Sequence, residues 1–192
     1  MRSTAEALAL VEGFAPAPEE EKSRELILAL LRETEAPFSR GQFNPGHITC
    51  TAVVLDPGRG RVLLMHHHRL RRWLLPGGHV EEDDVTLGDA ARREAVEETA
   101  VRIGGGAGRL VENLVGMDVH GIPANRKKDE PFHLHHDLIF AWQAESDEIA
   151  RSEEAREVAW CGTREFSRYA VPGSIVRAAV RAMTSLTRTM ER

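Results

Sequence analysis

The sequence predicts an α/β fold in which a mixed sheet is packed between helices. Two observations lead to this prediction. Apolar, strand-like segments recur between turns along the central part of the chain, and one amphipathic helix interrupts them near the middle. A second helix with an apolar stripe follows the last strand. The chain has 192 residues, which is enough for one domain of ordinary size with a sizeable core.

Composition and charge narrow the classes of function. The chain is 42% hydrophobic and 29% charged, as in globular proteins, and its net charge of −5 argues against nonspecific binding to nucleic acid. No apolar run approaches the roughly 18 residues of a membrane span, and no basic segment precedes an apolar stretch at the N-terminus. Cys50 and Cys161 lie in strand-like segments and are expected to be buried thiols. We therefore expect a cytoplasmic protein with no nucleic-acid or membrane partner.

Residues 1–44 read as a helical extension ahead of a main domain at 45–192. Helices are expected over 4–12 and 19–35, separated by a segment with two prolines at Phe14–Pro18. Plain helical packing is the simplest role for this extension. It could also cover an open sheet edge, form a dimer contact or cap a substrate pocket.

The main domain begins after a loop rich in turn formers at 37–46. A strand, a tight turn and a return strand are expected over 48–56, 57–60 and 61–66, which makes a β-hairpin. A glycine-rich connector is expected at 104–108. Further strands are expected at 114–120, 133–142 and 157–161, and a final helix begins near Pro172.

The helix near the middle of the chain is the most informative element. Thr86 can act as its N-cap, with Asp89 in the capping-box position. At about 100° per residue, Glu94 and Glu98 fall within about 20° of Leu87, and Glu97 lies about 80° away. The three carboxylates therefore share a strip that overlaps the small-residue face expected to pack on the rest of the fold.

Like charges that are partly desolvated side by side are costly. A hard divalent cation removes this cost, and carboxylate oxygens suit Mg²⁺ or Mn²⁺. A solvated, glutamate-rich helix whose alanines are simply good helix formers remains an alternative on the helix pattern alone.

The residues around the helix resemble the Nudix box. The resemblance runs from Trp73-Leu74-Leu75-Pro76-Gly77-Gly78 through Glu82 and Asp84 to Arg93-Glu94, two residues, and Glu97-Glu98. The chain departs from the pattern by one extra residue between Gly78 and Arg93, and by Ala100 where the family has glycine. The resemblance implies a Nudix-type α/β/α sandwich and Mg²⁺-dependent hydrolysis of a nucleoside diphosphate linked to another moiety.

The resemblance also implies roles for individual residues. Glu97 and Glu98 would hold the metal, while Glu94 would be a further ligand or would orient and deprotonate the attacking water. Arg93 would fix the helix carboxylates by ion pairing. Glu82, with Asp84, would support the metal site from the loop. Gly78, with Gly77, would let the backbone approach the metal-bound phosphate.

Basic residues and histidines are the candidates for substrate binding. Arg69, Arg71 and Arg72 are either solvated or positioned to contact an anionic substrate. His133, His135 and Asp137 share one face of their expected strand, and His120 could approach them across a hairpin. The histidine set, with His79, is either a group of satisfied, partly buried side chains or a wall of the substrate pocket that could also bind a transition metal. In contrast, His66-His67-His68 cannot all reach one ion, since neighbours in a strand face opposite ways.

Two other functions stay open at this stage. One is an isomerase of the isopentenyl-diphosphate type, which the histidines make worth naming, and the other is a non-catalytic nucleotide-sensing domain. The expected partner is a small nucleotide or diphosphate, and a homodimer is plausible. Base stacking could come from one of four aromatic residues, Trp73, Phe132, Phe140 or Trp142.

Overall fold

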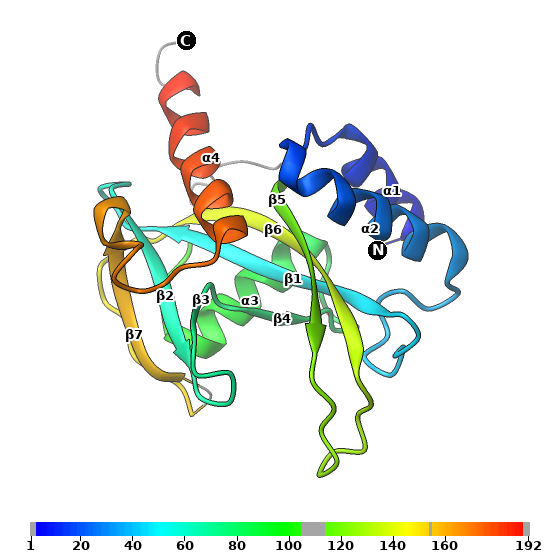
Figure 1. The fold of residues 1–192 in the computed structure, drawn as a ribbon. Coiled ribbons are helices and arrows are strands. Elements are labelled where there is room, and N and C mark those ends of the chain that lie inside the picture. Colours follow the sequence, from blue (N-terminus) through cyan, green and yellow to red (C-terminus); the bar gives the residue numbers. More distant parts are fainter. Residues whose placement is uncertain (1–2, 105–113, 154, 190–192) are drawn as a thin grey trace.

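The computed structural model describes residues 3–104, 114–153 and 155–189, and it confirms the α/β prediction. A curved, seven-stranded mixed sheet lies between helices (Figure 1). The helices are α1 (Thr4–Gly13), α2 (Glu21–Glu33), α3 (Leu87–Thr99) and α4 (Gly173–Thr189), with short 3-10 turns at Pro18–Glu20 and Thr163–Glu165. The strands are β1 (Gly46–Leu55), β2 (Arg61–His67), β3 (Trp73–Leu74), β4 (Gly77–His79), β5 (Leu114–Ile122), β6 (His133–Gln143) and β7 (Ala155–Gly162). The expected connector at 104–108 lies outside the described residues from Gly105 onward.

Strand β1 is the centre of the sheet. The strand order is β3-β2-β1-β6-β5, while β4 also pairs with β1 and β7 pairs with β2. The pairing of β1 with β6 is parallel and runs along all of β1, whereas the other pairings are antiparallel. The parallel register sets His47 opposite His135 and Thr49 opposite Asp137. Beyond the body of the sheet, β5 and β6 extend as a long hairpin (Figure 1).

The alternation of side chains along β1 separates two hydrophobic cores. Even-numbered residues such as Ile48 and Ala52 pack in one core with the alanines of α3 and with α1 and α2. Val53 and Leu55 pack on the other face, beneath α4. Toward the start of β1, however, this second face carries the polar side chains of His47, Thr49 and Thr51 in place of apolar ones. The fold therefore places a polar surface on the sheet beside an apolar core.

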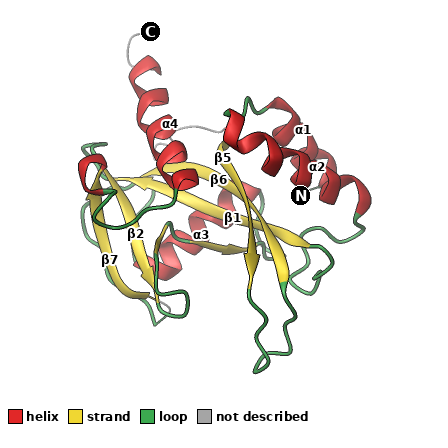
Figure 2. Ribbon diagram, in the orientation of Figure 1, coloured by secondary structure: helices red, strands yellow, loops and turns green. Residues whose placement is uncertain are grey.

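The two N-terminal helices are present as expected: α1 packs against α2, and α2 packs against β5 and its neighbours. Glu20, which is fully buried, receives hydrogen bonds from Arg181 of α4 at 3.2 and 2.8 Å. The Arg181 guanidinium also lies over the Phe14 ring, 4.8 Å from its centroid. The connection between α1 and α2 is thus joined to α4, the last helix (Figure 2).

Several local predictions are confirmed. Thr86 caps α3 and forms the capping box with Asp89, and both cysteines are buried free thiols. Ala100 ends α3 in the left-handed conformation, with φ of 52°, at the position where the resemblance expects glycine. In α4, Ala178, Ala179 and Ala182 are buried, whereas Val180 is 45% exposed. In the part of the chain that the structure describes, no helix is long and apolar enough to cross a membrane.

Candidate functional site

The backbone of strand β4 packs against two glutamates of α3, Glu94 and Glu98. The Gly77 N–H donates to Glu98 Oε2 at 2.9 Å. A Cβ atom added to Gly78 would lie 2.7 to 2.8 Å from the carboxyl atoms of Glu94. Only glycine at position 78 therefore leaves room for the Glu94 carboxylate in its observed place.

The three glutamates differ in exposure. Glu98 is 6% exposed and the Glu94 side chain 15%, whereas the Glu97 side chain is 58% exposed. The offset of about 80° between Glu97 and Leu87 on the helix explains this difference. Glu94 and Glu98 thus face inward, and Glu97 lies at the rim of the site.

Arg93 joins the acidic loop to the helix. Its guanidinium donates to both carboxylate oxygens of Asp84, at 3.0 and 3.1 Å, and to the His79 carbonyl at 2.8 Å. It also donates to Glu94 at 3.0 Å and to Glu97 at 3.1 Å. Hydrogen bonds to Asp84 and Glu94 raise the pKa of Arg93 well above its ordinary value, against the opposing effect of burial. Arg93 thus contacts carboxylates of both the loop and the helix, and Asp84 is its buried partner.

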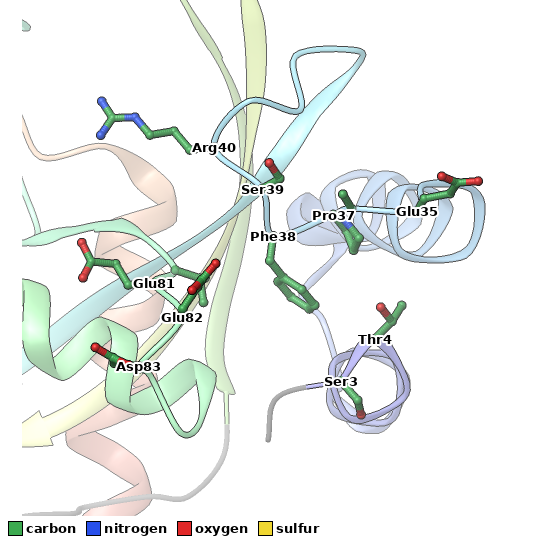
Figure 3. Close-up of a pocket in the computed structure, with 12 residues that line it drawn as sticks. Ser3, Thr4, Glu35, Pro37, Phe38, Ser39, Arg40, Glu81, Glu82 and Asp83 are labelled. Atoms are coloured by element: carbon green, nitrogen blue, oxygen red, sulfur yellow. The ribbon is translucent and has the colours of Figure 1, made fainter.

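A cavity of about 770 Å³ opens between the N-terminal extension and the acidic loop. The segment 35–40, the start of α1 and the loop residues Glu81, Glu82 and Asp83 line it (Figure 3). Glu82 therefore faces this cavity. The helix glutamates do not line it; they lie at the junction of β4 and α3.

Histidines from four strands gather on the polar part of the sheet. The His47 ring lies 5.0 Å from that of His79, 5.1 Å from His133 and 4.9 Å from His135, measured between centroids. His120 approaches His135 at 5.7 Å across the β5–β6 pairing, as predicted. One ligand atom from each of His47, His133 and His135 lies within 4.8 Å of the others. Among the described residues, this histidine trio is the set that converges so closely.

Backbone carbonyls fix the orientation of two of these rings. His47 Nδ1 lies 3.0 Å from the Gln42 carbonyl, and His133 Nδ1 lies 2.8 Å from the Pro131 carbonyl. Since a carbonyl can only accept, each Nδ1 carries a hydrogen and each Nε2 of the neutral ring presents a lone pair. In the described part of the chain, the buried His47 Nε2 has no hydrogen-bond partner.

Burial disfavours the charged form of three rings in the cluster, since it lowers the pKa of His47, His79 and His135. Desolvation lowers the pKa of His79 to about 3 and that of His135 to about 2, and neighbouring positive charges and rings act in the same direction. Asp137 lies beside them and accepts from the hydroxyls of Thr49 and Thr51 at 2.9 and 2.8 Å. Its burial raises its pKa to about 6.

Strand β4 separates the two groups of residues. Gly78 faces Glu94, while the next residue, His79, places its ring against His47 and His135. The structure thus brings Gly78, Arg93 and the glutamates together on one side, and the predicted histidines together on the other.

Other predicted residues lie elsewhere. Arg69 donates to the Pro123 carbonyl at 3.0 Å. In the described part of the chain, no hydrogen bond or ion pair joins Arg69, Arg71 or Arg72 to the glutamates or to the histidine cluster. Phe140 and Trp142 are buried in the core, which removes them as candidates for stacking on a base, whereas Phe132 is 63% exposed.

Sequence reasoning missed His47. We expected β1 to begin at Ile48, although the run His47, Thr49, Thr51 already shows period-2 polarity. The parallel register with β6, which joins residues 88 positions apart, is what gives His47 its place in the cluster.

The NUDIX domain profile matches residues 46–178. A relative from Lactococcus lactis subsp. cremoris, named "Probable DHNTP pyrophosphohydrolase", is 30% identical over 128 residues, which are 66% of this chain and 72% of the relative. The fold is similar to that of a MutT protein from Methanosarcina mazei Go1, with a TM-score of 0.53, 18% identity, and coverage of 76% of this chain and 95% of that one. It is also similar to an Ap4A hydrolase binary complex from C. elegans, with a TM-score of 0.51, 16% identity, and coverage of 73% and 98%.

Proposed function

Because this chain belongs to the Nudix family and is a Nudix hydrolase, we propose that it cleaves a phosphoanhydride bond with the help of Mg²⁺ or Mn²⁺. The substrate class is a nucleoside diphosphate linked to another moiety, or a related nucleotide. The observation that carries this proposal is the packing of Glu94 and Glu98 against the backbone of Gly77 and Gly78, with Arg93 holding the neighbouring carboxylates.

The residues at this junction fit a hard divalent cation. Glu94, Glu97 and Glu98 supply carboxylate oxygens, the donors that Mg²⁺ and Mn²⁺ prefer. The missing Cβ of Gly78 leaves the space in which the Glu94 carboxylate lies. Glu82 and the Gly78 carbonyl would add oxygen ligands from the loop and the strand. When bound, the ion would neutralise charge on non-bridging phosphoryl oxygens.

The chain's own residues prepare the reaction. The Gly77 N–H holds one oxygen of Glu98 in place. Glu94, oriented by Arg93, would position a water in line with the phosphorus and accept its proton. Arg93 is a positioning residue, since its donors are directed to Asp84, the His79 carbonyl and the helix glutamates. Phosphoryl transfer depends mainly on such positioning and on charge stabilisation.

The polar face of the sheet would receive the substrate. His79, His120, His133 and His135 form its wall, and Arg69, Arg71 and Arg72 would contact anionic groups from the β2–β3 turn. The relative's name, pyrophosphohydrolase, supports cleavage of a phosphate–phosphate bond. The similarity to an Ap4A hydrolase concerns the fold. We include in the same proposal a helical extension at 1–44 before a hydrolase domain at 45–192. The proposal also includes a cytoplasmic location and a homodimer.

The test is a substrate panel with Mg²⁺, made of dinucleoside polyphosphates, sugar nucleotides and oxidised nucleotides. Chromatography would measure release of a nucleoside monophosphate or phosphate. On the best substrate, Glu97→Gln and Glu98→Gln are each expected to lower kcat by about 100-fold or more, with an unchanged circular dichroism spectrum. Glu33→Gln, an exposed residue at the end of α2, is the matched control.

Two outcomes would contradict the proposal. Wild-type turnover in both glutamine variants would reject the assignment of these carboxylates. Conversion of a diphosphate substrate to an isomer, without release of any phosphorylated fragment, would instead favour the isomerase alternative.

A further inference from the structure

We propose that His47, His133 and His135 form a second metal site, which binds a divalent transition ion such as Zn²⁺ and is separate from the carboxylate site. This inference does not depend on the proposed hydrolysis. It rests on the convergence of three imidazoles, on the hydrogen bonds that orient two of them and on a buried ring nitrogen of His47 that has no hydrogen-bond partner among the described residues.

The sheet itself brings the three rings together. His133 and His135 are two residues apart on β6 and therefore share a face, and the parallel register places His47 beside His135. Their ligand atoms lie within 4.8 Å of one another. Nitrogen ligands of a tetrahedral Zn²⁺ are about 3.3 Å apart, as follows from Zn–N bonds of about 2.0 to 2.1 Å. Metal binding would draw the three ligand atoms closer by side-chain rotation while the strands stay in place.

The hydrogen bonds have the pattern that metal-binding histidines need. A ligating imidazole usually donates its other N–H to a carbonyl or a carboxylate, which fixes its tautomer and aim. His47 and His133 do this to the carbonyls of Gln42 and Pro131. The Nε2 atom of His47 is completely buried and unpartnered within the described structure, an arrangement that is costly unless a ligand occupies the lone pair.

The donor set selects the class of ion. Three neutral imidazoles suit Zn²⁺, Cu²⁺, Ni²⁺ or Co²⁺, whereas Mg²⁺ prefers oxygen ligands. Three histidines with an open fourth position are also the ligand set of many catalytic zinc sites. His135 is only partly buried, so the fourth position can be reached from solvent. His79, whose ring lies 5.4 Å from that of His135, is the nearest candidate for it.

Charges around the cluster are compatible with a cation. Arg40 and Lys128 act on His79 as positive neighbours. However, Arg40 pairs with Glu130 at 3.5 Å, and the Asp137 carboxylate lies two residues beyond His135 on the same face. Negative charge therefore lies close to the three imidazoles.

The experiment uses the full chain after removal of metals with EDTA. Calorimetric titration with ZnCl₂ in 10 mM MgCl₂ is expected to show one bound Zn²⁺ per chain, and Co²⁺ is expected to give the intense visible absorption of a tetrahedral site. His133→Ala and His135→Ala should each weaken Zn²⁺ binding at least 100-fold and abolish the Co²⁺ band. His47→Gln provides a third variant that keeps much of the buried volume.

Two controls separate this site from others. His68→Ala removes an exposed histidine outside the cluster and should leave Zn²⁺ affinity unchanged. Glu98→Gln should also leave it unchanged, since Glu98 lies on the other side of β4. Circular dichroism of each metal-free variant checks that it is folded. The proposal is overturned if folded wild type binds no Zn²⁺, if Mg²⁺ displaces it, or if folded His133→Ala and His135→Ala both bind with wild-type affinity.

Discussion

Replacement of Gly78 by alanine tests whether Glu94 must sit against β4. The new Cβ would meet three carboxyl atoms of Glu94 at 2.7 to 2.8 Å, closer than side chains approach one another. Backbone does not block this methyl group; the nearest atoms belong to the far end of a flexible side chain. Glu94 can therefore move away, so the fold should survive while the carboxylate leaves its position.

The size of the effect follows from that displacement. An ordinary contact needs about 3.4 Å, so the Glu94 carboxylate must retreat by roughly 0.7 Å and its 3.0 Å bond to Arg93 must stretch or break. A misplacement of about 1 Å can lower a rate 100-fold, so we expect kcat to fall by about 10- to 100-fold. This corresponds to about 1.4 to 2.7 kcal/mol of transition-state stabilisation.

The assay is steady-state hydrolysis of the best substrate, with thermal unfolding measured in parallel. Gly60→Ala is the matched control, because no atom lies within 4 Å of its added Cβ, and it should keep wild-type kcat. In a Glu94→Gln background, Gly78→Ala should have little further effect, since both changes act on the same group. Full activity of Gly78→Ala, or fully additive losses in the double variant, would refute the reasoning.

Three further changes test single contacts. Glu20→Gln should destabilise the fold by roughly 3 kcal/mol in urea unfolding at pH 7, since it leaves the Arg181 guanidinium without its buried partner. Burial alone raises the pKa of Glu20, but the hydrogen bond and charge of Arg181 lower it overall. The stabilisation by this ion pair should therefore be complete above pH 4.5 and lost as the pH falls further. Equal acid sensitivity of the variant and the wild type would contradict this. Ala100→Gly should raise stability by about 1 kcal/mol, because φ of 52° suits glycine, and an unchanged midpoint of unfolding would argue against strain there. Arg93→Lys should lower kcat at least 10-fold with a smaller change in KM, since an ammonium cannot reproduce the fork of bonds to Asp84.

Most of the fold could be predicted from local patterns in the sequence. Apolar segments bounded by turn residues predicted the strands, and the capping residues Thr86 and Asp89 predicted the start of α3. The spacing of Arg93, Glu94, Glu97 and Glu98 was sufficient to recognise the family, because each residue acts within one short helix and the loop before it. The sequence is informative here because neighbours in space are also neighbours along the chain.

Contacts between distant segments were harder to predict. His120 and His135 are joined by an antiparallel hairpin, whose pairing can be anticipated from the two strands and the loop between them. His47 and His135 are joined by a parallel pairing, whose register depends on how α3 and the intervening strands pack. The exposure of Phe132 and the burial of Phe140 likewise depend on how far the β5–β6 hairpin extends past the sheet.

Arg93 partly explains why glutamates of α3 can face inward, which the helix pattern alone did not reveal. Arg93 contacts Asp84, Glu94 and Glu97 at 3.0 to 3.1 Å, so part of their mutual repulsion is relieved by a side chain of the same helix. Together with Glu98, however, these residues comprise four carboxylates and one guanidinium. One fixed cation cannot balance four anions at close range, and burial of Glu98 strengthens the imbalance because low dielectric weakens screening. The same arginine that orders the carboxylates therefore leaves an excess of negative charge at the junction of β4 and α3, which a divalent cation would offset.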